Sequence, residues 1–107
     1  MTECGRTILI IDGDKNVRLG MAAYLAECGY SVQGEATAEL GIARYTTLKP
    51  EIVISELQLS DSDGLSVLKA LRDIDADVPV ILVSDVGMVH EVAEALRLGG
   101  DDAVSYA

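Results

Sequence analysis

Apolar residues gather in five short and nearly unbroken runs along the chain. The first run, residues 7–11, is rich in β-branched side chains and lies between Gly5 and the acidic segment that starts at Asp12. Runs of this length, bounded by glycine or acidic residues, are typical of buried β-strands. The same pattern predicts a weaker strand and then three more, at residues 30–35, 52–55, 78–83 and 103–106.

The four segments between these runs repeat apolar residues every three or four positions, which is helical spacing. We expect the first helix to stop at Gly29, the second to run from an N-cap at Thr37 to Lys49-Pro50, and the third to start at Gly64. The expected apolar faces, in chain order, are Val17, Met21, Tyr24, Leu25 and Cys28; Ala38, Gly41, Ile42, Tyr45 and Leu48; Leu65, Leu68 and Leu71; and Val89, Val92, Ala93 and Leu96.

Strands that are apolar throughout, alternating with helices, predict an α/β domain whose parallel sheet is covered on both faces. At 107 residues the chain is expected to be one domain, residues 1–107. Sheets of this kind bind ligands beyond the carboxyl ends of their strands. The candidate site residues at those ends are Asp12, Gly13, Asp14, Glu56, Ser84, Asp85 and Tyr106.

The composition and net charge of the chain oppose several kinds of binding. The net charge of −10 opposes direct binding to nucleic acid and to anionic membrane surfaces. The longest apolar runs are too short to span a bilayer, and the first residues lack the features of a signal peptide, so we expect a cytoplasmic protein. Cys4 and Cys28 have no metal-binding spacing.

The acidic residues at the strand ends allow two interpretations. Carboxylates brought together there repel one another unless they share a cation or a proton. Alternatively, Asp12 and Asp14 simply cap the first helix. Farther along, Asp61 and Asp63 are expected to form turns and caps ahead of the third helix.

Four segments together resemble the receiver domain of bacterial two-component response regulators. They are "ILIIDGDKNVR", "KPEIVISELQLSDSDGLSVLKALR", "DVPVILVSDVG" and "EALRLGGDDAVSYA", and the resemblance runs from Thr7 to the last residue. It implies a flavodoxin-like (βα)5 sheet with strand order 2-1-3-4-5. It also implies phosphorelay signalling, in which an aspartate accepts a phosphoryl group from a histidine kinase with the help of Mg²⁺. The implied partners are that kinase and an output domain or regulated protein.

Matched to the family pattern, the first half of the site has parts missing. Asp12 falls on the first acidic position, but Gly13 replaces the second, which binds Mg²⁺ directly, and Asp14 follows one residue later. Glu56 occupies the position of the phosphoacceptor aspartate, and the third metal ligand, a backbone carbonyl, would belong to Gln58. The resemblance therefore implies a weak Mg²⁺ site at most, made by Asp12, Glu56 and Gln58.

The second half of the site departs further from the pattern. Ser84 matches the hydroxyl residue that reads the phosphate, but Asp85 replaces a small residue and Tyr106 replaces the lysine. Transfer of a phosphoryl group requires positive charge from a metal or a lysine. We therefore expect a pseudo-receiver that is not an enzyme, requires no cofactor and lacks ordinary aspartyl phosphorylation.

Two roles remain for Glu56 in such a domain. It either imitates the phosphorylated state by accepting a hydrogen bond from Ser84, or the site has decayed while the fold is kept for protein binding. We favour the second role, because one carboxylate carries less charge and fewer acceptor atoms than a phosphate.

A second resemblance gives the alternative function. "DGDKNV" after the first strand and a serine closing a later strand also resemble haloacid-dehalogenase-type phosphatases, with Asp12 as nucleophile and Asp14 as general acid. That alternative lacks its catalytic lysine and leaves Glu56 unexplained.

The last expectation concerns the fifth helix of the receiver fold, for which the given sequence has only Ala107 after Tyr106. Without that helix one face of the sheet would expose apolar surface. We expect the native polypeptide to continue past Ala107 with this helix and an output domain, or else the domain to pair with another copy.

Overall fold

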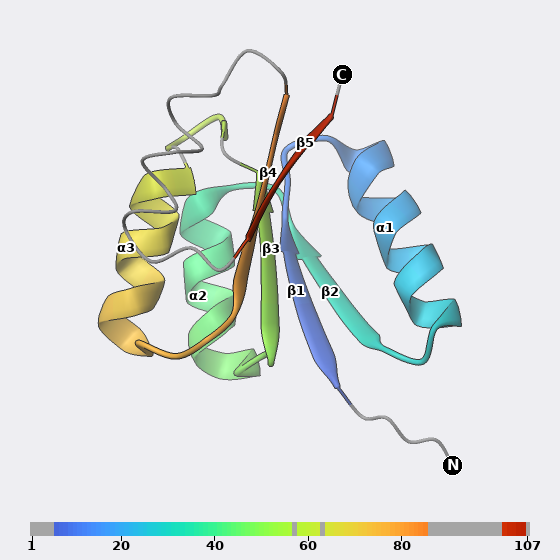
Figure 1. Cartoon of the computed structure of the whole chain (residues 1–107), viewed down its shortest axis with the longest axis horizontal. Helices are drawn as coiled ribbons and strands as arrows, with labels where there is room; N and C mark the ends of the chain where they lie inside the picture. The colour runs from blue at the N-terminus through green and yellow to red at the C-terminus, as the bar shows by residue number, and fades with distance from the viewer. Residues whose placement is uncertain (1–5, 57, 63, 86–101, 107) are drawn as a thin grey trace.

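In the described part of the chain, five parallel strands form one sheet in the order β2-β1-β3-β4-β5 (Figure 1). The computed structural model describes residues 6–56, 58–62, 64–85 and 102–106, and of residues 64, 84, 85 and 102–106 it describes the backbone alone. The elements are β1 (Thr7–Ile11), α1 (Lys15–Glu27), β2 (Ser31–Glu35), α2 (Ala38–Leu48), β3 (Ile52–Glu56), α3 (Gly64–Ile74), β4 (Val80–Asp85) and β5 (Asp102–Tyr106). The flavodoxin-like strand order is confirmed, whereas the helix expected around Val89 to Leu96 lies outside the described residues.

Five strand boundaries differ from those expected, one of them the end of β3, which includes Glu56. β2 begins at Ser31 because Tyr30 still belongs to the turn after α1, where its N–H donates to the Leu25 carbonyl. β4 begins two residues later than expected and runs on through Ser84 and Asp85. Its far end is extended by pairing with β5, which itself begins one residue earlier than expected.

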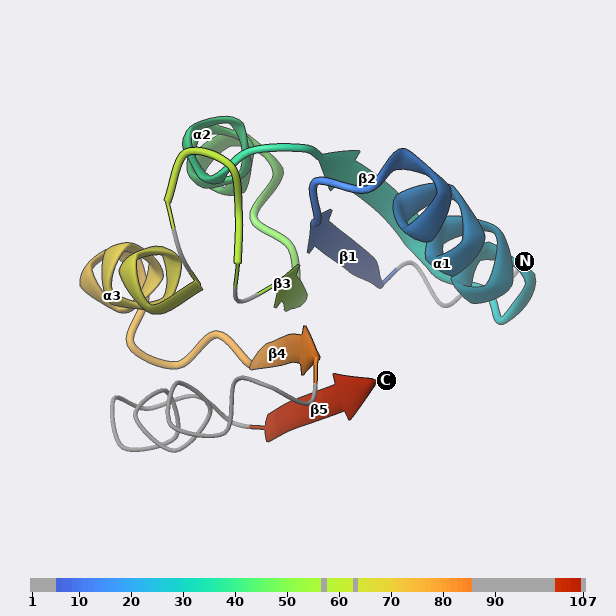
Figure 2. The same cartoon turned by 90° about the horizontal axis from the view of Figure 1, so that it is seen from above.

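The helices lie on both sides of the sheet, with α2 and α3 on one face and α1 on the other (Figures 1 and 2). The α2–α3 face holds the main hydrophobic core. Its helix side is built from buried residues of α2 and α3, and its sheet side from alternate residues of β1, β3 and β4. Its members include Leu9, Ile11, Tyr45, Val53, Val67, Leu68, Leu71, Val80 and Leu82.

Helix α2 approaches β1 closely, and Gly41 makes this approach possible. A Cβ atom added at Gly41 would lie 2.7 Å from Cγ1 of Ile11 and nearer still to its Cδ1. No side chain fits in that space unless Ile11 moves, so glycine sets the distance between helix and sheet.

The prediction for α1 was wrong in part. Val17, Met21 and Leu25 are half-buried as the spacing indicated, but Tyr24 and Cys28 are exposed and no residue of this helix is fully buried. The reason is position, because α1 contacts mainly the edge strand β2 and contacts β1 less (Figure 2). Among the described residues, no helix is long and apolar enough to cross a membrane.

Candidate functional site

The carboxyl ends of β1, β3 and β4 lie at the same end of the sheet, because the strands are parallel. Ile11 of β1 is paired with Ser55 of β3, and Glu56 is paired with Val83 of β4. The residues that follow β1 therefore lie beside Glu56. On the neighbouring strands, Ser84 is paired with Ser105 and Asp85 with Tyr106, which places these backbone positions at the same end of the sheet.

Asp12 is the most deeply buried acidic residue that the structure describes, at 1 % exposure. Its Oδ1 accepts a hydrogen bond from the Asp14 N–H at 2.9 Å. Its main chain is held as well, because its N–H donates to the Glu35 carbonyl and Nη1 of Arg18 donates to the Asp12 carbonyl oxygen at 2.7 Å. The other carboxylate oxygen, Oδ2, is buried and has no hydrogen-bond partner among the described residues.

Of the two roles predicted for Asp14, a shared cation site and a helix cap, the structure shows the cap. It is the N-cap of α1, and its Oδ1 accepts hydrogen bonds from the N–H groups of Asn16 at 2.8 Å and Val17 at 3.3 Å. These bonds satisfy donors that have no partner inside the helix. The capping interpretation is thus confirmed for Asp14, whereas Asp12 shapes the turn with one oxygen and leaves the other buried.

Glu56 ends β3, the strand paired with β1, and its carboxylate bends toward Gly13. The Gly13 N–H donates to Oε1 of Glu56 at 3.2 Å. Burial raises the pKa of the Glu56 carboxyl above its ordinary value, and the bond from Gly13 opposes this rise. The neighbouring Asp12 carboxylate raises the pKa of Glu56 further, and the charge of Asp14 adds a smaller contribution.

The ends of β1 and β3 therefore bring two carboxylates, those of Asp12 and Glu56, close enough to influence each other. Both are acceptors when ionised, which explains how a buried oxygen of Asp12 lacks a partner. An oxygen of this kind fits a proton or a cation. No group of three or more histidine, cysteine or acidic residues that could hold a metal occurs in the described part of the chain. Gln58, the third predicted ligand, is exposed in the loop after β3.

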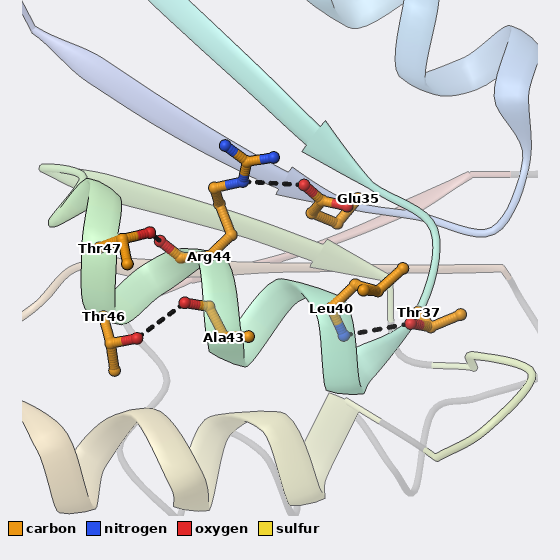
Figure 3. Close-up of polar contacts among 7 residues, drawn as sticks. All are labelled: Glu35, Thr37, Leu40, Ala43, Arg44, Thr46 and Thr47. Atoms are coloured by element: carbon orange, nitrogen blue, oxygen red, sulfur yellow. Dashed lines mark hydrogen bonds and ion pairs between the residues drawn. The ribbon is translucent and has the colours of Figure 1, made fainter.

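The loop after β3 contains a contact that the sequence analysis missed. Asp61 was expected to act ahead of α3, but its carboxylate caps α2 instead, accepting from the N–H groups of Ala38 at 2.9 Å and Glu39 at 3.0 Å. These two bonds hold the pKa of Asp61 below its ordinary value. Thr37 caps the same helix as predicted, with its hydroxyl oxygen accepting from the Leu40 N–H at 3.2 Å (Figure 3).

Comparison with known proteins gives the same assignment along almost the whole chain. The profile of the response regulator receiver domain matches residues 8–105. The chain is similar to the chemotaxis protein CheY of Thermotoga maritima, with 30% identity over 94% of this chain and 84% of that protein. It is also 30% identical to the regulatory protein AtoC of Escherichia coli, over 97% of this chain but only 22% of AtoC.

Solved structures agree with the fold. A response regulator receiver domain protein from Clostridium thermocellum superposes with a TM-score of 0.90 at 19% identity, covering 94% of this chain and 81% of that one. The strand order, the acidic residues at the strand ends and the match over residues 8–105 agree with one another. The chain belongs to the response regulator receiver domains of two-component signalling systems.

Proposed function

We propose that this receiver domain works as a signalling and protein-interaction module without ordinary aspartyl phosphorylation. The observation that carries this proposal is the state of Glu56, the residue at the acceptor position. Its carboxylate accepts a hydrogen bond from the Gly13 N–H, and its pKa is raised by burial and by the neighbouring buried Asp12, so it is not a free acceptor at the end of the strand.

The charges around Glu56 support the proposal. A phosphoryl donor is an anion, and it would approach a site where Asp12, Asp14 and Glu56 already contribute negative charge. The chain has only three lysines, Lys15, Lys49 and Lys69, and the end of β5 carries Tyr106 in the lysine position. Mg²⁺ would offset part of this charge if bound, but Gly13 removes one of the carboxylates that would hold it.

The direction of the Glu56 side chain favours loss of the phosphorylation site over imitation of the phosphorylated state. β3 lies between β1 and β4, and the Glu56 carboxylate bends toward Gly13 on the β1 side. Ser84 lies on β4, on the opposite side of Glu56. A glutamate that imitated a phosphate would bend toward that serine. On this basis the domain has kept the fold for binding and is not an enzyme.

The partners in this proposal are proteins of a two-component system in the cytoplasm, namely a histidine kinase, an output domain or a regulated protein. The names and lengths of the relatives support an attached output domain. AtoC is a regulatory protein and the DltR of Streptococcus agalactiae a transcriptional regulatory protein, and the chain spans 22% and 44% of their lengths. The phosphatase alternative receives no support from the similarities described above.

Acetyl phosphate with Mg²⁺, read by intact mass, tests the proposal. The native protein is expected to gain no phosphoryl group, whereas the Glu56→Asp, Gly13→Asp, Tyr106→Lys triple variant is expected to gain one. A labelled native protein would overturn the proposal. Turnover of p-nitrophenyl phosphate that is lost in Asp12→Asn would instead support the phosphatase.

A further inference from the structure

Gly13 and Glu56 are in direct contact, although 43 residues separate them in the sequence. A Cβ atom added to Gly13 would lie 3.8 Å from the Ala36 carbonyl oxygen and 3.9 Å from Oε1 of Glu56. Both distances are ordinary van der Waals contacts, so a methyl group fits at position 13. A longer side chain would start from a carbon that already touches the Glu56 carboxylate.

We propose that Gly13 and Glu56 are a coupled pair, in which the Gly13 N–H holds the glutamate carboxylate and the absence of a carboxylate at position 13 lets Glu56 lie beside Asp12. The proposal rests on the proposed function, because it explains why both positions differ from the receiver pattern in the same chain. In this arrangement the site keeps two neighbouring carboxylates, those of residues 12 and 56. The second one reaches its place from β3 rather than from the turn after β1.

The length of the glutamate side chain is the first reason why the two positions depend on each other. Aspartate at position 56 would be shorter by one methylene, about 1.5 Å, and would withdraw the acceptor from the Gly13 N–H. That N–H would then lose its partner. Glutamate is therefore the acidic residue that fits opposite a glycine here.

Charge is the second reason why the two positions depend on each other. Aspartate at position 13 would add a carboxylate beside two that already repel each other, those of Asp12 and Glu56. At a separation of about 4 Å, two like charges repel measurably even in water and more strongly where the site is partly buried. Each of the two positions thus determines which residue the other tolerates.

A double-variant cycle tests this coupling, with stability measured by urea unfolding of the whole chain at pH 7. Gly13→Asp is expected to lower the folding equilibrium constant about tenfold in the native background, because of the repulsion. In a Glu56→Gln background the same substitution is expected to lower it less than about threefold, because one of the charges is gone.

Two control variants separate charge from space. Gly13→Asn has nearly the size of Gly13→Asp without its charge, and its cost is expected to be the same in both backgrounds. Gly20→Asp adds the same carboxylate on α1, where nothing lies within 4 Å of an added Cβ, and it is expected to show no coupling to Glu56. If Gly13→Asp alone does not fold, folding of the Gly13→Asp, Glu56→Gln double variant supports the pair, and failure of both overturns it.

Amide hydrogen exchange gives a second readout that does not depend on overall stability. Glu56→Asp is expected to speed exchange of the Gly13 amide about tenfold, since it loses its acceptor, while the Asp14 amide, bonded to Asp12, keeps its rate. Additive costs in the cycle, or an unchanged Gly13 amide, would overturn the pair and leave the silent phosphorylation site standing. Labelling of the native protein by acetyl phosphate would overturn the proposed function and leave the pair standing.

Discussion

The two faces of the sheet are covered differently, although one set of strands forms both. On the α2–α3 face, Leu68 and Leu71 have no exposed surface and Tyr45 is 4 % exposed. On the other face every residue of α1 is described and none is buried, while Leu19 is 56 % and Tyr24 67 % exposed. The helices on the two faces thus differ in burial, because α1 lies mainly against the edge strand β2, which offers it less surface to cover.

The largest difference between the faces should appear when a leucine is shortened on each. Leu68→Ala is expected to lower the free energy of unfolding by about 2–5 kcal/mol, since it leaves a cavity in a core with no exposed surface. Leu19→Ala should change it by less than about 0.5 kcal/mol. Urea unfolding of both variants measures the comparison, and equal losses would show that α1 is as tightly packed as α3.

Glycine substitutions should sharpen the comparison by giving opposite signs. Gly41→Ala is expected to cost about 1–3 kcal/mol, because its methyl group would overlap Ile11. Gly20→Ala in α1 meets nothing within 4 Å and should stabilise the protein by about 0.5–1 kcal/mol through helix propensity. Thermal unfolding measures both.

A rescue variant checks the cause assigned to Gly41. Ile11→Val removes the Cδ1 atom that an alanine at position 41 would meet first. Combined with Gly41→Ala, it should recover part of the loss. If the two costs simply add, the contact with Ile11 is not the reason for the glycine.

The acidic site at the carboxyl ends of β1 and β3 predicts a smaller, pH-dependent effect on stability. The folded-state pKa of Glu56 is raised from its ordinary 4.5, chiefly by burial, so its contribution to stability is fully present below that value and is lost as pH rises through the raised pKa. The Glu56→Gln variant lacks this contribution and so does not lose it as pH rises. The stability of the variant relative to the native protein should therefore increase from pH 4 to pH 7, as measured by thermal unfolding at each pH. A constant difference across that range would contradict the raised pKa.

The smallest expected effect belongs to the ion pair that joins the packed helix α2 to the edge strand β2. Nε of Arg44 lies 2.9 Å from Oε2 of Glu35, and 44% of the Arg44 side chain is exposed (Figure 3). Arg44→Ala and Glu35→Ala, alone and together, should show a coupling energy below about 1 kcal/mol in unfolding experiments. The coupling should shrink in 1 M salt, and a value that salt leaves unchanged would indicate a non-ionic contact.

Sequence patterns were sufficient to predict most of the fold. Strands buried on both faces produce apolar runs that stand out, and Thr37 and Lys49 mark the ends of α2 because caps are local signals. The start of β4 at Val80 and its extension through Asp85 were missed, since pairing with β3 begins at Val80 and pairing with β5 continues to Asp85, and no local residue indicates either. The overestimated burial of α1 has a related cause, because it depends on which strand the helix lies against.

The candidate site, like the fold, could be predicted only in part. The positions of Asp12, Gly13 and Glu56 at one end of the sheet follow from the strand order, which the resemblance to receiver domains implied. The bond from Gly13 to Glu56 could not be predicted, because a glycine in the sequence shows neither the direction of its N–H nor the space beside it. For the same reason, Asp61 could be recognised as a cap but not assigned to its helix.

The Asp61 cap has a practical consequence for experiments on this domain. The amides of Ala38 and Glu39 belong to α2, yet their hydrogen-bond acceptor comes from the loop that follows Glu56. In a two-dimensional amide spectrum, their resonances should therefore report the position of that loop. A kinase, an output domain or an ion that displaces the loop would be detected at α2 even if it never touched that helix.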